Sequence, residues 1–265
     1  NFNDGTLAKK GDKYVYENNR YARVVVKNDY VGTDSDDESF FLYTQYEIGS
    51  VHWFLVEDIK WRLMAVQNKY AMLMTDELIA TKAFSDEEVE KGWLWENSNL
   101  RAWLNDEFFY EAFDEKERKT IATGETYCDY ISNPGRIRYP RETVKDKVRV
   151  PRWREIREPQ LFRNDDDRMA TVTDYATATG GVRLSQAAID YFVNNGIETV
   201  KTPEECKKYI GCGVYWLADT ELNTNHVYIV YEYGNTMSYY ATERSRTVRP
   251  VILCKYENIK NELKK

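Results

Sequence analysis

Residues 95–105 read W-E-N-S-N-L-R-A-W-L-N and carry more structural information than any other stretch of the chain. Asn97 or Ser98 can cap a first helical turn, because either side chain can accept a hydrogen bond from a free backbone N–H. Apolar residues then recur at helical spacing and predict one buried face: Leu100, Trp103, Leu104 and Phe108. The stretch contains no metal-ligand set, nucleophile or phosphate loop. It therefore indicates a fold rather than a reaction.

The composition indicates a mixed α and β protein. With 265 residues, of which 42% are hydrophobic, the chain is long enough to bury a sizeable core. Its 21 Tyr, 7 Trp and 10 Phe favour β-structure over a helical bundle. The formal net charge of -7 argues against a dedicated nucleic-acid binder, which needs a concentrated basic surface. We therefore expect no nucleic-acid partner.

Hydropathy and cysteine usage bear on the compartment. No window reaches the roughly 20 apolar residues of a membrane-crossing helix, so we expect no membrane span. The chain starts at Asn1 in polar sequence, as expected of a trimmed chain or of a mature product whose export signal has been removed. The four cysteines, Cys128, Cys206, Cys212 and Cys254, include no C-x-x-C pair, which weakens zinc and thioredoxin-like interpretations. We expect free buried thiols, with a Cys206–Cys212 disulfide as the alternative.

The first third of the chain is predicted to be mainly β. Residues 21–27 are β-branched and typical of a short strand. Residues 59–65 alternate apolar and polar side chains, as a half-buried strand does. Asn68-Lys69 can then turn this strand back into residues 70–74. We expect an antiparallel hairpin here.

Helices and connections alternate through the middle of the chain. Asp114 and Glu117 form a capping arrangement for a second short helix that ends near Ile121. Residues 124–145 hold Gly, Pro and scattered charges, which predict a long surface connection. Four further segments complete this part: a strand at 147–150, a helical turn at 152–158, a helix at 186–193, and a capped helix that starts at 202–205 and ends at Gly211.

The last fifty residues are predicted to form a sheet. Gly234-Asn235 is a hairpin signal, and both faces of residues 225–233 carry aromatic or apolar side chains, so we expect the sheet to be covered on both sides. Four segments have strand-like patterns: residues 213–217, 225–233, 237–241 and 247–253. With no internal repeat or composition break, residues 1–265 are predicted to be one domain with its core at about 20–255.

Several of these stretches resemble an uncharacterised bacterial domain family. That family carries an I-x-W-R-V-L-like strand, a T-W-E-x-S-x-L-R-x-W-L-N helix start and a terminal G-V-R-P. The matching pieces here are residues 59–64, 95–105 and 247–251, in the same order. The chain departs from the family at 215–219, where it reads Y-W-L-A-D in place of W-W-L-R-S, and at Thr247, which replaces a glycine. Residues 177–212 exceed what the family needs, which predicts an inserted helical piece.

Members of this family resemble the C-type-lectin-like fold. The resemblance implies an α+β fold with a twisted antiparallel sheet flanked by helices. Seven residues are then expected to be structural: Trp61, Trp95, Ser98, Arg101, Trp103, Trp216 and Arg249. Formylglycine-generating and sulfoxide-synthase enzymes share the fold, but they need a reactive cysteine or a histidine-rich iron site. Cys254 follows the V-R-P motif without such partners, and we interpret it as a core thiol.

Residue types that could support chemistry are present, but not in the required spacing. The two histidines, His52 and His226, form no metal triad or Ser/His pair, so we expect each to be structural or exposed. The acidic loop at 32–39 lacks the glycine and terminal glutamate of an EF-hand. Residues 164–167, N-D-D-D, could bind calcium, but the chain lacks the E-P-N or Q-P-D triplet that accompanies a lectin-type calcium site. The sequence therefore predicts no catalytic residue, no metal site and no cofactor.

Binding is the function class that the sequence favours. Tyr, Asn, Ser and Arg gather near the C-terminus, and these side chains give rigid amphipathic area and adaptable hydrogen bonds. The ligand-binding candidates are Asn223, Asn225, Tyr228, Tyr239, Tyr240, Arg244 and Arg246. We expect a non-catalytic bacterial domain, secreted or at the cell surface, that binds a protein, peptide or glycan. The alternatives are an enzyme of the same fold, a retroelement-diversified receptor, or a purely structural module.

Overall fold

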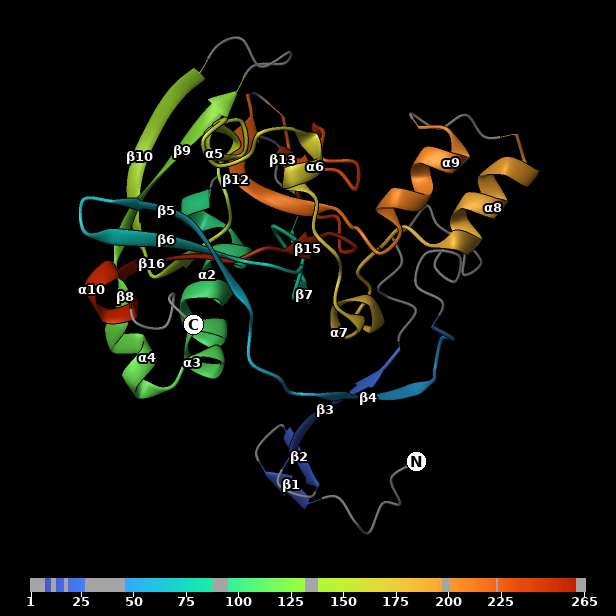
Figure 1. Cartoon of the computed structure of the whole chain (residues 1–265), viewed down its shortest axis with the longest axis horizontal. Helices are drawn as coiled ribbons and strands as arrows, with labels where there is room; N and C mark the ends of the chain where they lie inside the picture. Colours follow the sequence, from blue (N-terminus) through green and yellow to red (C-terminus); the bar gives the residue numbers. More distant parts are fainter. Residues whose placement is uncertain are drawn as a thin grey trace.

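The computed structural model describes residues 8–10, 13–16, 19–26, 46–87, 95–131, 138–196, 201–222 and 224–260. Within them the chain is α+β, as predicted, with mostly antiparallel sheets and short helices. Figure 1 shows a small N-terminal sheet at the bottom and two helices, α8 (Gln186–Asn194) and α9 (Pro203–Cys206), at the right of the main body. These two helices lie inside the predicted helical piece at 177–212.

The largest sheet has seven strands and contains the C-terminal ribbon. Its main path is β10 (Arg138–Asp146), β9 (Gly124–Ile131), β12 (Tyr215–Glu221), β13 (His226–Val230) and β14 (Thr236–Tyr240). β15 (Thr247–Val248) pairs with β12, and β7 (Ala80–Thr81) pairs with β15. The β9–β12 and β12–β15 pairs are parallel. The hairpin predicted at Gly234-Asn235 is confirmed by the antiparallel β13–β14 pair.

Two further sheets complete the β-structure. The five-stranded sheet has the order β11 (Val148–Arg149), β16 (Val251–Lys255), β6 (Tyr70–Thr75) and β5 (Trp61–Gln67), with β8 (Ile121–Ala122) paired to β16. The N-terminal sheet is an antiparallel meander of β1 (Ala8–Lys10), β2 (Lys13–Tyr16), β3 (Asn19–Val25) and β4 (Val51–Leu55). The predicted turn is confirmed, because Asn68 and Lys69 link β5 to β6 with positive φ.

Short helices cover these sheets. The 95–105 stretch begins with η2 (Trp95–Asn97) and continues through α2 (Asn99–Trp103), the π-helical η3 (Leu104–Phe108) and α3 (Phe109–Ala112). The others are α4 (Glu115–Thr120), α5 (Trp153–Ile156), α6 (Asp165–Arg168), α7 (Asp174–Ala178), η4 (Lys207–Tyr209) and α10 (Tyr256–Ile259). Ser98 caps α2, and Asp114 with Glu117 forms the capping box of α4, as predicted.

The central strands of the seven-stranded sheet, β12 and β13, are buried on both faces, whereas β14 is partly exposed, so the expectation of a sheet covered on both sides holds for its inner strands. On one face, Trp216 and Ile229 belong to the larger core, together with Leu100 of α2. On the other face, Tyr215 packs among side chains from α5 and from the segments that follow it. A third cluster packs α8 and α9 against Tyr233. The sheet is therefore the central layer of the protein.

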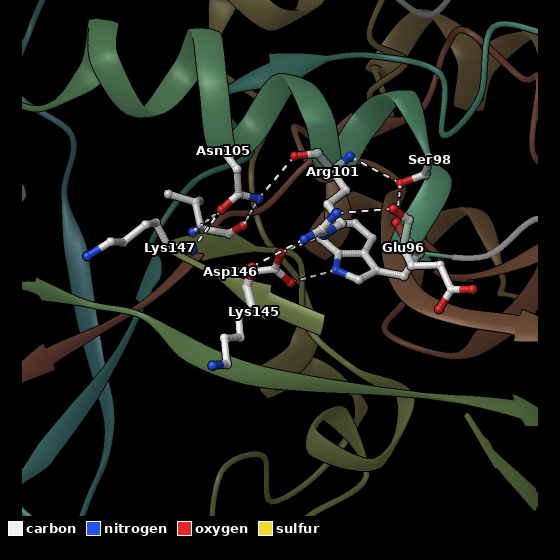
Figure 2. A network of polar contacts seen from close by, with 9 residues as sticks. Glu96, Ser98, Arg101, Asn105, Lys145, Asp146 and Lys147 are labelled. Carbon is white, nitrogen blue, oxygen red and sulfur yellow. Dashed lines mark hydrogen bonds and ion pairs between the residues drawn. The ribbon is translucent and has the colours of Figure 1, made fainter. Parts of the chain in front are cut away.

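A polar network ties the 95–105 stretch to β10 (Figure 2). Asp146, at the end of β10, accepts a hydrogen bond of 2.8 Å from Trp95 Nε1 and pairs at 2.6 Å with Arg101 Nε. Arg101 also donates to the carbonyls of Glu96 and Lys145, at 3.1 and 3.2 Å. One buried carboxylate thus holds both the indole and the guanidinium of the motif in place.

Asn105 extends the same network to β11. Its Oδ1 accepts the backbone N–H groups of Lys147 and Val148, at 2.7 and 3.1 Å. Its amide nitrogen donates to the carbonyls of Arg101 and Val148, at 3.0 and 2.8 Å. The amide therefore bridges the helix and the strand, and the polar residues of the motif serve the fold.

The other tryptophans expected to be structural are held by packing. Trp61 stacks on Phe113 with ring centroids 5.8 Å apart. Trp103 is half-buried against the larger core, with Lys82 Nζ 5.2 Å from its ring centroid. Trp216 is fully buried, and its Nε1 donates to the Lys82 carbonyl at 2.8 Å. Lys82 thus contacts Trp103 through its side chain and Trp216 through its carbonyl.

Arg249 divides what was predicted as one strand at 247–253. Residues on its two sides belong to different sheets, β15 and β16, because Pro250 lacks the N–H that a continuous ladder needs. The fully buried Arg249 side chain spans the junction and donates to the Thr75 and Arg168 carbonyls, at 3.1 and 2.8 Å. The V-R-P motif is thus the crossing from one sheet to the other.

The prediction of a surface connection at 124–145 is wrong. Residues Gly124–Ile131 and Arg138–Asp146 form the antiparallel β9–β10 pair, with a register shift between Pro140 and Thr143. β10 is an edge strand, where a proline and a bulge are tolerated, so the residues that suggested a loop instead mark a sheet edge.

All four cysteines are free and buried, which confirms the expectation of free thiols over a Cys206–Cys212 disulfide. Cys254 lies in the larger core. Among the helices that the structure describes, none has the length and apolar character needed to cross a membrane. The acidic loop at 32–39 lies outside the described residues.

Candidate functional site

The β13–β14 ribbon brings polar and aromatic side chains onto one face. Its register places His226 opposite Tyr240 and Tyr228 opposite Ser238. Because side chains alternate along a strand, these four point to the same side of the sheet. Gly234, with φ of 80°, supplies the left-handed turn residue that fixes this register.

Glu221, the last residue of β12, lies at the centre of this face. Its Oε2 accepts a hydrogen bond of 2.8 Å from Ser238 Oγ, and His226 Nδ1 lies 3.2 Å from the same oxygen. Thr224 Oγ1 adds a longer contact of 3.4 Å to Glu221 and accepts the His226 N–H at 3.0 Å. Glu221 is buried, and these partners supply the hydrogen bonds that a buried carboxylate needs.

Tyr240 forms the exposed rim of the same face. Its ring is 51% exposed and meets the His226 ring edge to face, with centroids 4.5 Å apart. We name this group of five residues the Glu221 cluster: Glu221, Thr224, His226, Ser238 and Tyr240. It combines an apolar ring in contact with solvent and an adjacent set of hydrogen-bonding side chains.

Tyr228, a predicted ligand-binding residue, lies beneath the cluster rather than at its surface. It is buried, and its ring packs against Trp153 of α5 with centroids 6.4 Å apart. Burial and the nearby carboxylates of Glu221 and Asp219 raise the pKa of Tyr228 to about 12. The expectation that its ring contacts a ligand is therefore not met, because β13 is an inner strand that α5 covers.

Asp219 is a second buried acid on β12. It accepts the backbone N–H groups of Asp129 and Trp153, at 2.8 and 2.5 Å. Burial outweighs these two hydrogen bonds and raises the pKa of Asp219 to about 6. Its contacts join β9 and α5 to β12, so we assign it to the scaffold of the site.

The other predicted binding residues lie apart from the cluster. Tyr239 points to the opposite face of the ribbon, where the Arg246 guanidinium lies 4.4 Å from its ring centroid. Arg244 is exposed in the turn after β14, and the Asn225 carbonyl accepts the Ala241 N–H at 3.0 Å. Asn223 lies outside the described residues.

The cluster contains residue types found in hydrolases, but not their arrangement. Ser238 Oγ donates to Glu221, and within the described residues it makes no hydrogen bond to His226. This geometry therefore lacks the Ser–His contact of a Ser-His-Asp triad, and the Glu221 carboxylate accepts the Ser238 hydrogen bond in place of an imidazole. No group of three or more His, Cys, Asp or Glu side chains that could hold a metal ion occurs in the described part of the chain.

Most of the chain matches one known protein family. Residues 68–255 match the model of a domain of unknown function, DUF6273. The chain belongs to this family. The comparison with curated proteins and the comparison with solved structures give no match. The Glu221 cluster and the 95–105 network lie inside the DUF6273 region, whereas β1 to β5 precede it.

Sequence reasoning found Tyr240 but missed its partners in this DUF6273 domain. The composition of the segment predicts Tyr239 and Tyr240 together as binding residues, although neighbouring residues of a strand point to opposite faces of the sheet. A register counted from Gly234-Asn235 as a two-residue turn would place His226 opposite Glu243. The observed turn has Tyr231 opposite Asn235, and this register places His226 opposite Tyr240, so the sequence signal locates the hairpin but not these pairs. Glu221 had no local signal, since only β12–β13 pairing brings it to the ribbon.

Proposed function

We propose that this protein is a non-catalytic ligand-binding domain whose binding surface is the Glu221 cluster. The observation that carries the proposal is the exposed Tyr240 ring next to hydrogen-bonding groups that are already oriented by one buried carboxylate. A ring held by His226 loses little conformational freedom when a ligand packs on it. The surface is therefore preorganised for binding.

A glycan is the ligand class that this surface fits best. Sugar rings present C–H groups that pack on an aromatic face and hydroxyl groups that exchange hydrogen bonds with carboxylate, imidazole and hydroxyl side chains. Tyr240 supplies the first kind of contact. The half-buried His226 and Ser238 supply the second, and the buried Glu221 orients them. Peptides and proteins are the competing ligands of the same surface.

The proposal includes an extracytoplasmic bacterial protein with a C-type-lectin-like arrangement of its DUF6273 region. Antiparallel sheets flanked by short helices support the fold part of the proposal. Fractionation of cells that express the natural gene tests the location. A protein found only in the cytoplasmic fraction contradicts that part and leaves the binding test below unaffected.

An array of immobilised glycans and an array of short peptides test the binding function, with affinities then measured by calorimetry. Tyr240→Ala is expected to lower the affinity for the best glycan at least tenfold. Tyr127→Ala is the matched control, because Tyr127 is 48% exposed on β9 of the same sheet but lies away from the cluster. The proposal is wrong if neither array yields a ligand, or if both variants weaken binding equally. A ligand found only among peptides contradicts the choice of glycan.

A further inference from the structure

β14 is an edge strand whose outer hydrogen-bonding groups can be identified. The Ala241 N–H donates to the Asn225 carbonyl and the Tyr231 N–H to the Asn235 carbonyl, so odd-numbered residues of the ribbon form the hydrogen-bonded pairs with β13. Thr236, Ser238 and Tyr240 must then direct their backbone N–H and C=O groups away from β13. The Tyr240 carbonyl accepts the Glu243 N–H at 3.1 Å, so the open segment of the edge is centred on Ser238. In the described residues β14 pairs with β13 alone.

The two edges of the seven-stranded sheet differ in protection. The β10 edge carries Pro140, a register shift and several charged residues, all of which oppose pairing with another strand. The β14 edge reads T-M-S-Y-Y, with no charge, no proline and no register shift. Met237 and Tyr240 are exposed there. The β14 edge thus lacks the features that keep strands from pairing between molecules.

We propose that β14 pairs with β14 of a second copy of this chain, antiparallel, around a two-fold axis at Ser238. The two Ser238 residues then exchange their N–H···O=C hydrogen bonds across the axis. Thr236 of each copy lies opposite Tyr240 of the other, and Met237 lies opposite Tyr239. This inference goes beyond the proposed binding function and does not depend on it.

The second copy is the occupant that the strand sequence favours. A two-fold interface must be complementary to itself, and this register pairs Ser with Ser, Thr with Tyr, and Met with Tyr. β-branched–aromatic and hydroxyl pairs are favourable across strands, and a methionine sulfur packs well on an aromatic ring. All five side chains are uncharged, so no like charges meet at the axis.

The pairing would also join the two Glu221 clusters. Ser238 and Tyr240 point to the same face as Glu221, so a two-fold axis along the normal of the sheet places both clusters on one continuous face. A dimer of this kind presents two binding surfaces to one target.

Disulfide cross-linking tests the register directly. Ser238→Cys places two thiols across the axis in a hydrogen-bonded pair with about 5.5 Å between Cα atoms, which suits a disulfide. Mild oxidation of this variant with diamide is expected to give a covalent dimer. Thr236→Cys is the matched control, because the two Thr236 positions are four residues apart, about 13 Å along the strands, and cannot be bridged. The native thiols are buried and do not compete.

Sedimentation equilibrium of the unmodified chain gives a second readout. We expect the mass of a dimer, and Ser238→Pro is expected to weaken the dimer at least tenfold by removing the outward N–H. Ser238→Ala loses the same hydroxyl but keeps the N–H, so it should remain dimeric. Circular dichroism checks that both variants fold. If Ser238→Pro does not fold, the cross-linking of Ser238→Cys still tests the inference.

Three results would overturn the inference: a monomeric chain, a dimer that Ser238→Cys fails to cross-link, or cross-linking of Thr236→Cys equal to that of Ser238→Cys. The inference would also be contradicted if the protein co-purified with a different extended peptide bound along β14 in place of a second copy.

Discussion

At the scale of single residues, one carboxylate accounts for much of the 95–105 motif. Asp146 has a side chain that is 1% exposed, and it binds both the Trp95 indole and the Arg101 guanidinium. Arg101 is 25% exposed, so the pair is partly shielded from water. The charge of the motif is therefore occupied in holding a helix to a strand and is not available to a ligand.

Replacement of this carboxylate should destabilise the protein. Asp146→Asn leaves the Arg101 charge without its partner and is expected to lower the free energy of unfolding by about 2 kcal/mol. Urea titration measures the change. Glu115→Gln is the control, because it breaks the Lys119 ion pair on an exposed helix surface and should change stability little. Equal effects of the two variants would contradict a structural role for Asp146.

The same scale shows what sequence could and could not predict about the candidate site. Tyr240 was predicted from composition, because tyrosine is typical of recognition surfaces whatever its neighbours are. Glu221 and Ser238 were not, since a glutamate at position 221 and a serine at 238 become partners only through β12–β13–β14 pairing. Tyr228 was assigned to the surface because sequence alternation does not say which face a helix such as α5 will cover.

At the scale of elements, turns and caps were the most predictable features. The Asn68-Lys69 turn and the caps at Ser98 and Asp114 depend on local backbone chemistry, which a short stretch of sequence contains. The β9–β10 strands were missed because their pairing is stabilised by the rest of the sheet. The 247–253 segment was predicted as one strand because its apolar pattern continues across a change of sheet.

The β5–β6 turn allows a stabilising substitution. Lys69 has φ of 70°, a left-handed conformation that strains any residue with a Cβ. Lys69→Gly is expected to raise the free energy of unfolding by about 0.5 to 1 kcal/mol, and thermal unfolding measures it. Gln67→Gly, one residue before the turn in β5, is the control and should destabilise the protein. A loss of stability in Lys69→Gly would show that the lysine side chain contributes more than the backbone strain removes.

At the scale of the whole molecule, two acids with raised pKa values, the half-buried Glu232 and the buried Asp219, contribute to the pH dependence of stability. Burial raises the pKa of Glu232 from 4.5 to about 7, although the Arg246 charge acts in the opposite direction. Between these two pKa values the folded protein binds more protons than the unfolded chain. The free energy of unfolding contributed by Glu232 therefore falls as pH rises from 4.5 to about 7, and Asp219 acts in the same direction between 3.8 and about 6.

Urea unfolding at pH 4.5 and pH 8 checks this dependence. Glu232→Gln removes the titrating group, so the loss of stability between the two pH values should be about 1 to 3 kcal/mol smaller than in the natural chain. Glu107→Gln, on the exposed side of η3, is the control and should keep the natural pH dependence. A Glu232→Gln profile parallel to that of the natural chain would show that this carboxyl does not titrate in the window.

The crossing at Arg249-Pro250 has a consequence for synthesis. β16, made after every other described strand, lies between β11 and β6 in its sheet, and β15 enters the other sheet just before it. A nascent chain still lacking these residues can complete neither sheet, so both sheets must wait until residues 247–255 have been synthesised. Until then, the apolar strands made earlier lack partners and stay accessible to chaperones and proteases, so a chain truncated just before Thr247 is expected to be a protease substrate.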